Sequence, residues 1–308
     1  MRMVLQDLFD KWNVKFYKKG TENNIIFKIA RTIMRKSANL ILPTYLRISK
    51  RDKKVRETAP IIVSLTSFPA RINYLWCTIE TLKRQSVMPE KIILWLSKEQ
   101  FPNCTEDLPE MLRDMLDEQF EIRFVEKDLR SHKKYIYSFK EFPDKVIVTV
   151  DDDIFYNSRL LESLLVFHKK HPRCVICNRG WRIEKHSSYS DWEKIVGVEG
   201  PSFNILPTGV GGVLYPPHVY DDHIFDIDAI VNTCLRADDL WLNFMCRYKG
   251  SMIVTTGLKF EPIAISATQK EALCKTNNGT ISDNDIQISN ISKWTDKKLG
   301  VDFYCKIP

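Results

Sequence analysis

The stretch Val146-Ile-Val-Thr-Val150 runs directly into three consecutive carboxylates, Asp151, Asp152 and Asp153. Val and Ile are β-branched and only Thr149 is polar, so the stretch predicts a β-strand that is buried on both faces. Three adjacent like charges repel one another, and a cation among them relieves the repulsion. Because residues i and i+2 of an extended chain point to the same side, Asp151 and Asp153 could share one divalent ion.

Two interpretations of this acidic triplet remain open. In the first, hard carboxylate oxygens at the end of a strand hold Mg²⁺ or Mn²⁺ together with a phosphate-bearing substrate. Ligands of α/β sheets bind at such strand ends. In the second, the triplet is a solvated acidic turn that caps a following helix, a role that Asp also favours.

The bulk composition predicts a globular protein with a full core. The chain has 308 residues, of which 44% are hydrophobic and 28% are charged, enough for one large domain or two small ones. We find no apolar run long enough to span a membrane and no apolar core of the signal-peptide type near Met1. Eight scattered cysteines form no disulfide framework, so we expect a reducing, cytoplasmic location.

Positive charge is concentrated in residues 1–56, which hold 15 Lys and Arg against four Asp and Glu, while the remainder has a net charge of −4. Apolar residues of this segment alternate with basic ones at near-helical spacing; the apolar set is Ile25, Ile26, Ile29, Ile33, Leu40 and Ile41. This pattern is typical of a basic amphipathic helix on an anionic membrane surface. A helix that packs on the main domain with a solvated basic face is the alternative. No aromatic-basic interleaving favours nucleic acid. We therefore divide the chain into an N-terminal extension, 1–56, and a main domain, 57–308.

From residue 60 onward, strands alternate with helices of about ten residues. Strands are predicted over residues 61–65, 91–96, 120–125 and 146–150, and helices over 73–84, 108–119 and 134–142. Later, 160–168 predicts a helix, 174–177 and 253–256 predict strands, and 182–205 predicts irregular structure. The alternation indicates βαβ units and an α/β fold with a mixed, mostly parallel sheet flanked by helices.

Four motifs within residues 60–245 resemble those of nucleotide-sugar glycosyltransferases of the GT-A fold, especially bacterial ones of the family-two type. They are the strand and turn Val63-Ser-Leu-Thr-Ser-Phe-Pro-Ala-Arg71, the triplet Asp151-Asp-Asp153 as a DxD motif, Gly209-Val-Gly-Gly212, and Ala237-Asp-Asp239 at a helix start. The resemblance implies a Rossmann-like sheet and a divalent metal that stabilises the diphosphate leaving group. Asp153 would then be the main metal ligand, with Asp151 on the metal or the ribose.

The remaining candidate residues follow from the position of each motif. Donor-binding candidates lie at strand ends or in the glycine-rich turn; they are Thr66, Arg71, Asp128, Lys134, Asp151, Asp152, Gly211 and Gly212. A surface turn or solvated loop remains an alternative for most of them. Asp239 is the candidate catalytic base, because an inverting transfer needs a carboxylate opposite the leaving group. Asp238 is the alternative base, and both residues also suit ordinary helix capping.

Together these features predict a Mn²⁺- or Mg²⁺-dependent hexosyltransferase. It would move a sugar from a nucleoside-diphosphate sugar to a glycan or lipid-linked acceptor, with inversion, in surface polysaccharide assembly. The enzyme would be cytoplasmic, or peripheral on the inner face of the cell membrane. The alternatives are a nucleotidyltransferase, disfavoured because Thr66–Arg71 lacks glycine, and a non-enzymatic adaptor at a membrane surface.

Overall fold

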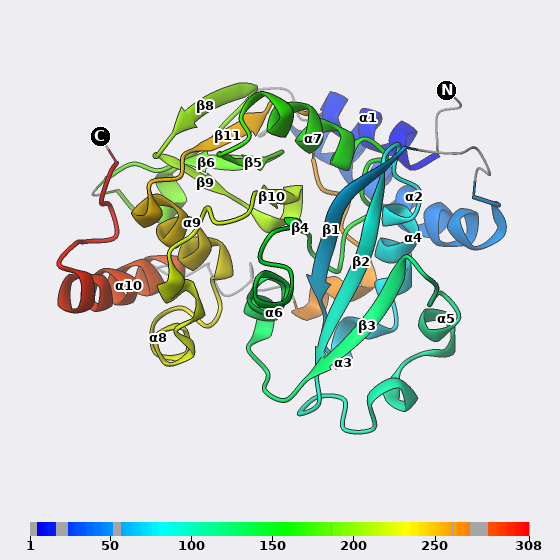
Figure 1. Cartoon of the computed structure of the whole chain (residues 1–308). Coiled ribbons are helices and arrows are strands. Elements are labelled where there is room, and N and C mark those ends of the chain that lie inside the picture. Colours follow the sequence, from blue (N-terminus) through cyan, green and yellow to red (C-terminus); the bar gives the residue numbers. More distant parts are fainter. Residues whose placement is uncertain are drawn as a thin grey trace.

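A computed structural model describes residues 5–16, 24–51, 57–185, 187–259, 261–271 and 283–307 (Figure 1). Its centre is an eight-stranded sheet. In spatial order the strands are β3 (Phe120–Val125), β2 (Met88–Ser97), β1 (Thr58–Thr66), β4 (Val146–Thr149), β10 (Val213–Tyr215), β5 (Val175–Cys177), β11 (Ile253–Thr256) and β8 (Val198–Ser202). The predicted α/β class is confirmed.

The sheet is mostly parallel, as predicted. β1 pairs in parallel with both β2 and β4, while β10 runs antiparallel between β4 and β5. The chain leaves β1 toward β2 and β3 on one side and returns to β4 on the other, so the strand order reverses between β1 and β4. Ligands of open α/β sheets bind at the carboxyl ends of strands beside such a reversal.

Helices cover both faces of this sheet because successive strand residues point to opposite sides. Ile62 of β1 belongs to the core on one face, whereas its neighbour Val63 belongs to the core on the other. The first core includes residues of α6 (Lys133–Glu141), α8 (Ile227–Thr233), α9 (Asp238–Lys249) and α10 (Asp283–Leu299). The second includes residues of α3 (Pro69–Ile72), α4 (Leu75–Leu82), α5 (Glu110–Arg113) and α7 (Leu160–Lys170).

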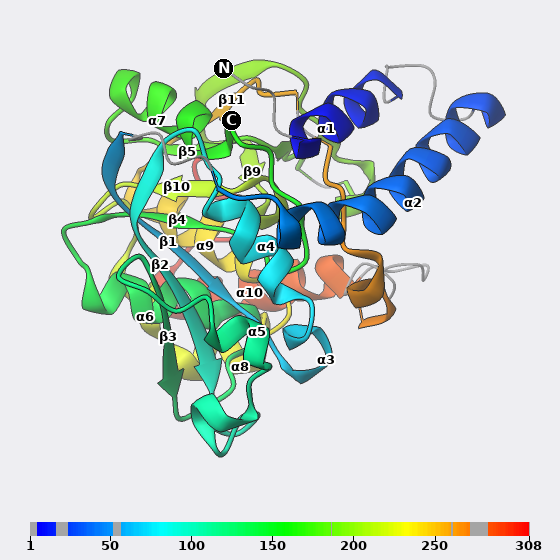
Figure 2. The same ribbon diagram turned by 90° about the vertical axis from the view of Figure 1, so that its right-hand side faces the viewer.

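The N-terminal extension forms two helices, α1 (Leu5–Phe16) and α2 (Ile25–Ile48), that lie against one another. Figure 2 shows α2 as a long helix at the periphery, outside α4, with α1 beside it. A third, smaller core joins α1 and α2 to Cys77 of α4 and to Phe155 and Ile263. The extension therefore packs on the main domain through one face. No described helix has the length and apolar character needed to cross a membrane.

Two predictions about secondary structure were wrong. The helix expected over 108–119 is helical only at Glu110–Arg113, because Lys83 Nζ donates to the carbonyl of Met115 at 2.7 Å and to Asp117 at 2.6 Å and holds the chain in turns there. Residues 182–205, expected to be irregular, contribute to a second sheet. Its strands are β7 (Glu193–Lys194), β6 (Gly180–Arg182) and β9 (Ile205–Pro207).

Candidate active site

A cleft of ≈780 Å³ opens where β1 and β4 end, on the side of the strand-order reversal. Its lining includes Thr66 at the end of β1, Asp151 after β4, Lys134 of α6 and Asp239 of α9. The antiparallel strand β10 adds the glycine turn, because Val213 pairs with Thr149 at the end of β4. Four motifs far apart in sequence therefore meet at one edge of the sheet.

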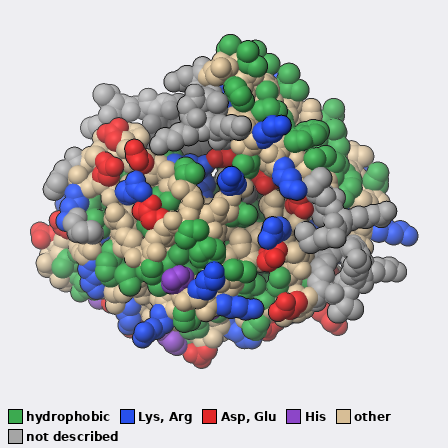
Figure 3. Space-filling model, turned by 90° about the horizontal axis from the view of Figure 1, so that it is seen from above, with side chains coloured by type: hydrophobic (Ala, Val, Ile, Leu, Met, Phe, Trp, Pro, Cys, Tyr) green, Lys and Arg blue, Asp and Glu red, His purple; other side chains and the backbone are tan. Residues whose placement is uncertain are grey.

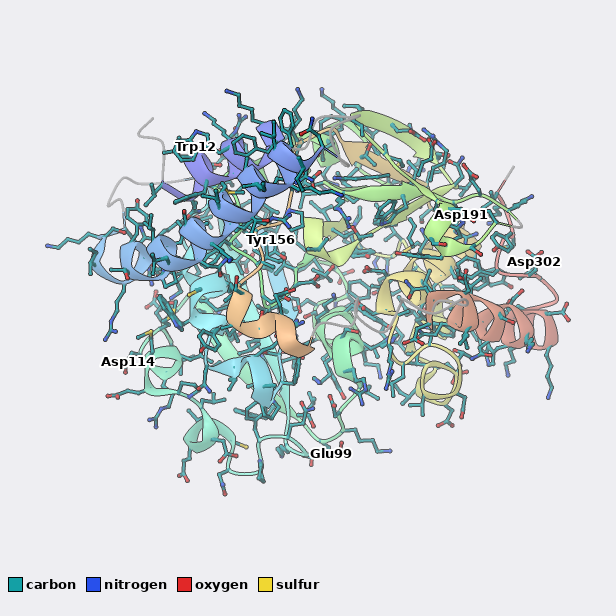
Figure 4. The ribbon with its side chains drawn as sticks, turned by 180° about the vertical axis from the view of Figure 1, so that it is seen from behind. Trp12, Glu99, Asp114, Tyr156, Asp191 and Asp302 are labelled. Carbon is teal, nitrogen blue, oxygen red and sulfur yellow. The ribbon has the colours of Figure 1, made fainter. Side chains whose placement is uncertain are left out.

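The acidic triplet is held from behind by buried partners. The backbone N–H of Asp151 donates to the hydroxyl of Tyr156 at 2.8 Å, and Tyr156 lies buried in the middle of the molecule (Figure 4). Thr78 Oγ1 donates to the carbonyls of Asp152 and Ile154 at 2.9 and 3.1 Å. These contacts fix the direction in which the three carboxylates leave the sheet.

Arg71 pairs with two carboxylates of the triplet. Its Nη1 lies 2.7 Å from Asp152 Oδ1, and its Nη2 lies 3.2 Å from Asp153 Oδ2. Asp152 also accepts from Ser67 Oγ at 2.6 Å. The like charges at the strand end are therefore partly balanced by the protein's own guanidinium, which weakens the sequence argument that a dication alone explains the triplet.

Lys134 connects the triplet to α9. Its Nζ lies 3.0 Å from Asp151 Oδ1 and 2.9 Å from Asp238 Oδ2. Burial lowers the pKa of Lys134, but the carboxylates of Asp151 and Asp238 outweigh burial and raise it well above its ordinary value. Burial likewise raises the pKa of Asp238, and Lys134 outweighs it, so that pKa falls below its ordinary value. Asp238 is therefore an ionised partner of a buried ammonium group.

Asp239 has a different environment from its neighbour. Its two carboxylate oxygens accept from the backbone N–H of Gly209 at 3.2 and 3.1 Å. Burial, followed by the negative charge of Asp238, raises the pKa of Asp239 to about 8. Two adjacent carboxyl groups thus have pKa values shifted in opposite directions, and Asp239 titrates where a general base must work.

The oxygens of Asp151 and Asp153 are the groups in the cleft that could hold a divalent metal. Among the described residues, no three His, Cys, Asp or Glu side chains converge as a complete protein-built metal site. Mg²⁺ is commonly held by one or two carboxylates together with substrate phosphates, which requires no such cage. Burial raises the pKa of Asp153 to about 6, and a bound cation would oppose this shift. The donor set is compatible with Mg²⁺ or Mn²⁺ that binds together with a diphosphate.

The other predicted donor-binding residues differ in their placement. Thr66 lines the cleft and donates through Oγ1 to the carbonyl of Trp95 at 2.7 Å. Asp128 lies on the lining as an ion-pair partner of Lys133. Gly211 and Gly212 do not line it. A Cβ on Gly211 would lie 2.7 Å from Arg179 Cβ, and Gly212, at φ +77°, lies against Leu160.

Gly209 is the glycine that touches the carboxylate cluster. A Cβ on Gly209 would lie 2.9 Å from Lys134 Nζ and 3.0 Å from Asp151 Oδ1. Because glycine has no side chain, the backbone can lie close to these charged groups, which any larger residue would displace. The motif Gly209-Val-Gly-Gly212 contains this glycine, but the predicted donor-binding residues were Gly211 and Gly212.

Several lining residues were not predicted as catalytic, donor-binding or metal-binding residues, among them Arg179, Tyr189 and Gln269. Arg179 follows β5, Tyr189 lies in the second-sheet region, and Gln269 donates from its Nε2 to Asp153 Oδ2 at 2.9 Å. No local motif marks them, because each reaches the cleft only through long-range packing. Arg179 gives a weak signal, since it lies two residues beyond the carboxyl end of the apolar strand 174–177.

Comparisons with known proteins give a likeness of structure only. The sequence matches no protein-family model and no curated protein. An apo UDP-glucose pyrophosphorylase is 9% identical, with a TM-score of 0.41 over 70% of this chain and 98% of that one. A UDP-glucose complex of UDP-glucose pyrophosphorylase is 11% identical, with a TM-score of 0.40 over the same shares. A UTP-bound enzyme of this kind from Acinetobacter baumannii is 9% identical, with a TM-score of 0.40 over 80% and 100%. At these TM-scores the likeness carries no argument about activity.

Proposed function

We propose that this chain is a metal-dependent, inverting glycosyltransferase of the GT-A type. It would transfer a hexosyl group from a nucleoside-diphosphate sugar to a hydroxyl of a glycan or lipid-linked acceptor. The observation that carries the proposal is the meeting of Asp151–Asp153 with Asp239 in one cleft, with Lys134 between them. Glycosyl transfer needs carboxylates for two tasks, one to hold a metal at the donor diphosphate and one to take the proton of the acceptor hydroxyl.

The triplet supplies the donor half of the site. A divalent metal on Asp153 and Asp151 would neutralise charge on the leaving diphosphate. Arg71 of α3 and Lys134 of α6 place two further positive groups on the same lining. Their charges favour a diphosphate, whereas the carboxylates alone would repel it.

Asp239 supplies the acceptor half. In the transfer, the bond between the anomeric carbon and the diphosphate oxygen breaks, and the nucleoside diphosphate leaves with the electron pair. The acceptor oxygen bonds to the opposite face of that carbon, and its proton passes to Asp239. The raised pKa of Asp239, about 8, makes its carboxylate a strong enough base for this step. Asp238 keeps Lys134 in place and is a positioning residue.

A nucleotidyltransferase is the alternative, and the compared UDP-glucose pyrophosphorylases belong to that class. Such an enzyme binds a triphosphate through a loop after the first strand. Here that loop, Thr66–Arg71, contains no glycine, the residue type that lets a backbone come close to phosphate groups. We therefore favour glycosyl transfer.

One experiment separates the two reactions. The purified chain is incubated with a panel of sugar nucleotides and MnCl₂, once alone and once with pyrophosphate. We expect slow, Mn²⁺-dependent release of nucleoside diphosphate and free sugar, with water as the acceptor, and loss of this release in Asp153→Asn. Formation of nucleoside triphosphate and sugar phosphate from the pyrophosphate arm would establish the alternative and overturn our proposal.

A further inference from the structure

Helix α2 is apolar on two opposite faces. Its inward stripe packs on the main domain and consists of Met34, Ala38, Leu42 and Leu46. Its outward stripe is exposed and consists of Ile25, Ile26, Ile29, Ile33, Leu40, Ile41 and Ile48. Leu40 is 78% exposed and Ile33 is 60% exposed, although both are large aliphatic side chains. A surface helix normally turns its polar face to water, so a contiguous apolar stripe of this kind indicates a binding surface.

The charges of the two helices are sorted by side. In α1, Asp7 and Asp10 point inward, where Asp7 accepts from Ser158 Oγ at 2.6 Å and Asp10 accepts from Asn157 Nδ2 at 2.9 Å. The exposed charged residues within 5–16 and 24–51 are all basic; they are Lys11, Lys15, Lys28, Lys36, Arg47, Lys50 and Arg51. The outer face of the extension thus combines aliphatic side chains with positive charge.

We propose that the outer face of α1 and α2 docks on an anionic lipid membrane. Aliphatic side chains would enter the acyl boundary while the surrounding Lys and Arg contact lipid phosphates. Trp12, 47% exposed on the outside of α1, adds an aromatic side chain of the type that anchors at membrane interfaces (Figure 4). In the view from above, hydrophobic side chains interspersed with Lys and Arg gather at the upper right (Figure 3).

Charge favours lipid over a second copy of this chain. A symmetric dimer through this face would place the same basic residues of both copies against each other. An anionic bilayer provides negatively charged lipid headgroups together with an apolar acyl region. α2 is 24 residues long, so it can lie along such a surface over about 36 Å.

Helix α2 is hydrogen-bonded to the segment that borders the candidate active site. Asn39 of α2 donates from Nδ2 to the carbonyl of Ala264 at 3.0 Å and accepts from the N–H of Ser266 at 2.7 Å. Between these two residues, the N–H of Ile265 donates to the carbonyl of Asp153 at 2.8 Å. A membrane on the outer face of α2 would therefore lie against a helix that is itself hydrogen-bonded to the segment beside the cleft, a position suited to an acceptor held in the bilayer. The docking argument itself rests on α1 and α2 and does not depend on the proposed reaction.

Vesicle binding of the full chain tests this inference. Sedimentation with vesicles of phosphatidylglycerol and phosphatidylcholine is compared with sedimentation with phosphatidylcholine alone. We expect clear binding to the anionic vesicles, reduced about tenfold or more in Ile33→Gln/Leu40→Gln. Lys28→Gln/Lys36→Gln should weaken binding about fivefold for each charge removed. Matched controls use exposed residues elsewhere, Val196→Gln/Val231→Gln and Lys297→Gln/Lys298→Gln, and should bind like the wild type.

Two further measurements make the outcome decisive. Thermal unfolding of each variant should match the wild type, because the substituted side chains lie outside the core. Analytical ultracentrifugation reports the oligomeric state. Absence of vesicle binding, equal binding to neutral and anionic vesicles, or equal losses in the control variants would overturn the proposal. A dimer dissociated by Ile33→Gln/Leu40→Gln, without vesicle binding, would assign the face to a second copy instead.

Discussion

Lys134 Nζ lies 2.9 Å from Asp238 Oδ2, and this ion pair ties α6 to the first turn of α9. The same ammonium group lies 3.0 Å from Asp151 Oδ1. One buried cation therefore connects the acidic end of β4 with the helix that carries Asp239. The donor and acceptor halves of the proposed site are held at a fixed separation by this contact.

Replacing Lys134 with Met should unfold or strongly destabilise the protein. The substitution leaves Asp151 and Asp238 without their common counter-charge, and a buried charge that loses its partner costs about 3–5 kcal/mol. Urea unfolding at pH 7 measures the change in free energy. Lys145→Met is the matched control, since Lys145 pairs with Glu90 at an exposed position and should lose about 0–1 kcal/mol. Equal effects of the two substitutions would contradict this account.

Asp239→Asn should change how stability depends on pH. The folded-state pKa of Asp239 is raised to about 8 from an ordinary value of 3.8, so the folded state binds its proton more tightly than the unfolded state. The stability linked to this proton is complete below pH 4 and is lost as the pH rises toward 8. The free energy of unfolding of Asp239→Asn, relative to that of the wild type, should therefore rise by about 1–3 kcal/mol between pH 4 and 8. This figure includes a reduction for solvent screening. Thermal unfolding across that pH range checks the trend.

Asp238→Asn provides the contrast within the same helix turn. The pKa of Asp238 is lowered in the folded state, so its stabilising contribution is present at neutral pH and is lost as the pH falls below its ordinary value. The variant should be less stable than wild type at pH 7, the opposite of Asp239→Asn. The same sign of change in both variants would refute the distinct roles that we assign to the two carboxyl groups.

Asp239→Asn should lower the rate of donor cleavage, although it raises stability at neutral pH. Removing a general base typically lowers the rate by about 10²–10⁴-fold. We expect donor cleavage in wild type to rise with pH through the titration of Asp239, and Asp239→Asn to show a low, flat profile. A variant with the wild-type rate and pH profile would eliminate Asp239 as the base.

Gly209→Ala should impair the site without removing a functional group. The new Cβ would lie 2.9 Å from Lys134 Nζ and 3.0 Å from Asp151 Oδ1, so one of these groups must move. We expect donor cleavage to fall by about tenfold or more. Gly300→Ala is the control: Gly300 has open space around it but a φ of +70°, so alanine there should cost some stability and leave activity unchanged. Normal activity of Gly209→Ala would show that the close approach has no role.

The sequence predicts the sheet well because strand patterns are local. The β-branched run before Asp151 and the alternation of strands with helices suffice to place β1 to β4 and to bring Lys134 near the triplet. Arg179 and Gln269 escape prediction because only tertiary packing carries them to the cleft. The division of α2 into a buried and an exposed apolar face was not predicted. Met34 and Ala38 on the buried face and the isoleucines on the exposed face belong to one helical pattern, so the sequence does not tell which of them pack on the domain.

Binding of nucleoside diphosphate and metal to the acidic triplet tests the central claim most directly. The full chain is titrated calorimetrically with UDP and with GDP, in MnCl₂ and in EDTA, and the same is done for Asp153→Asn. Asp296→Asn, at an exposed position on α10, is the control. We predict that one of the diphosphates binds only with Mn²⁺, with affinity at least about tenfold lower in Asp153→Asn and unchanged in the control. Binding that is equal in EDTA, or equal in Asp153→Asn, would contradict the account.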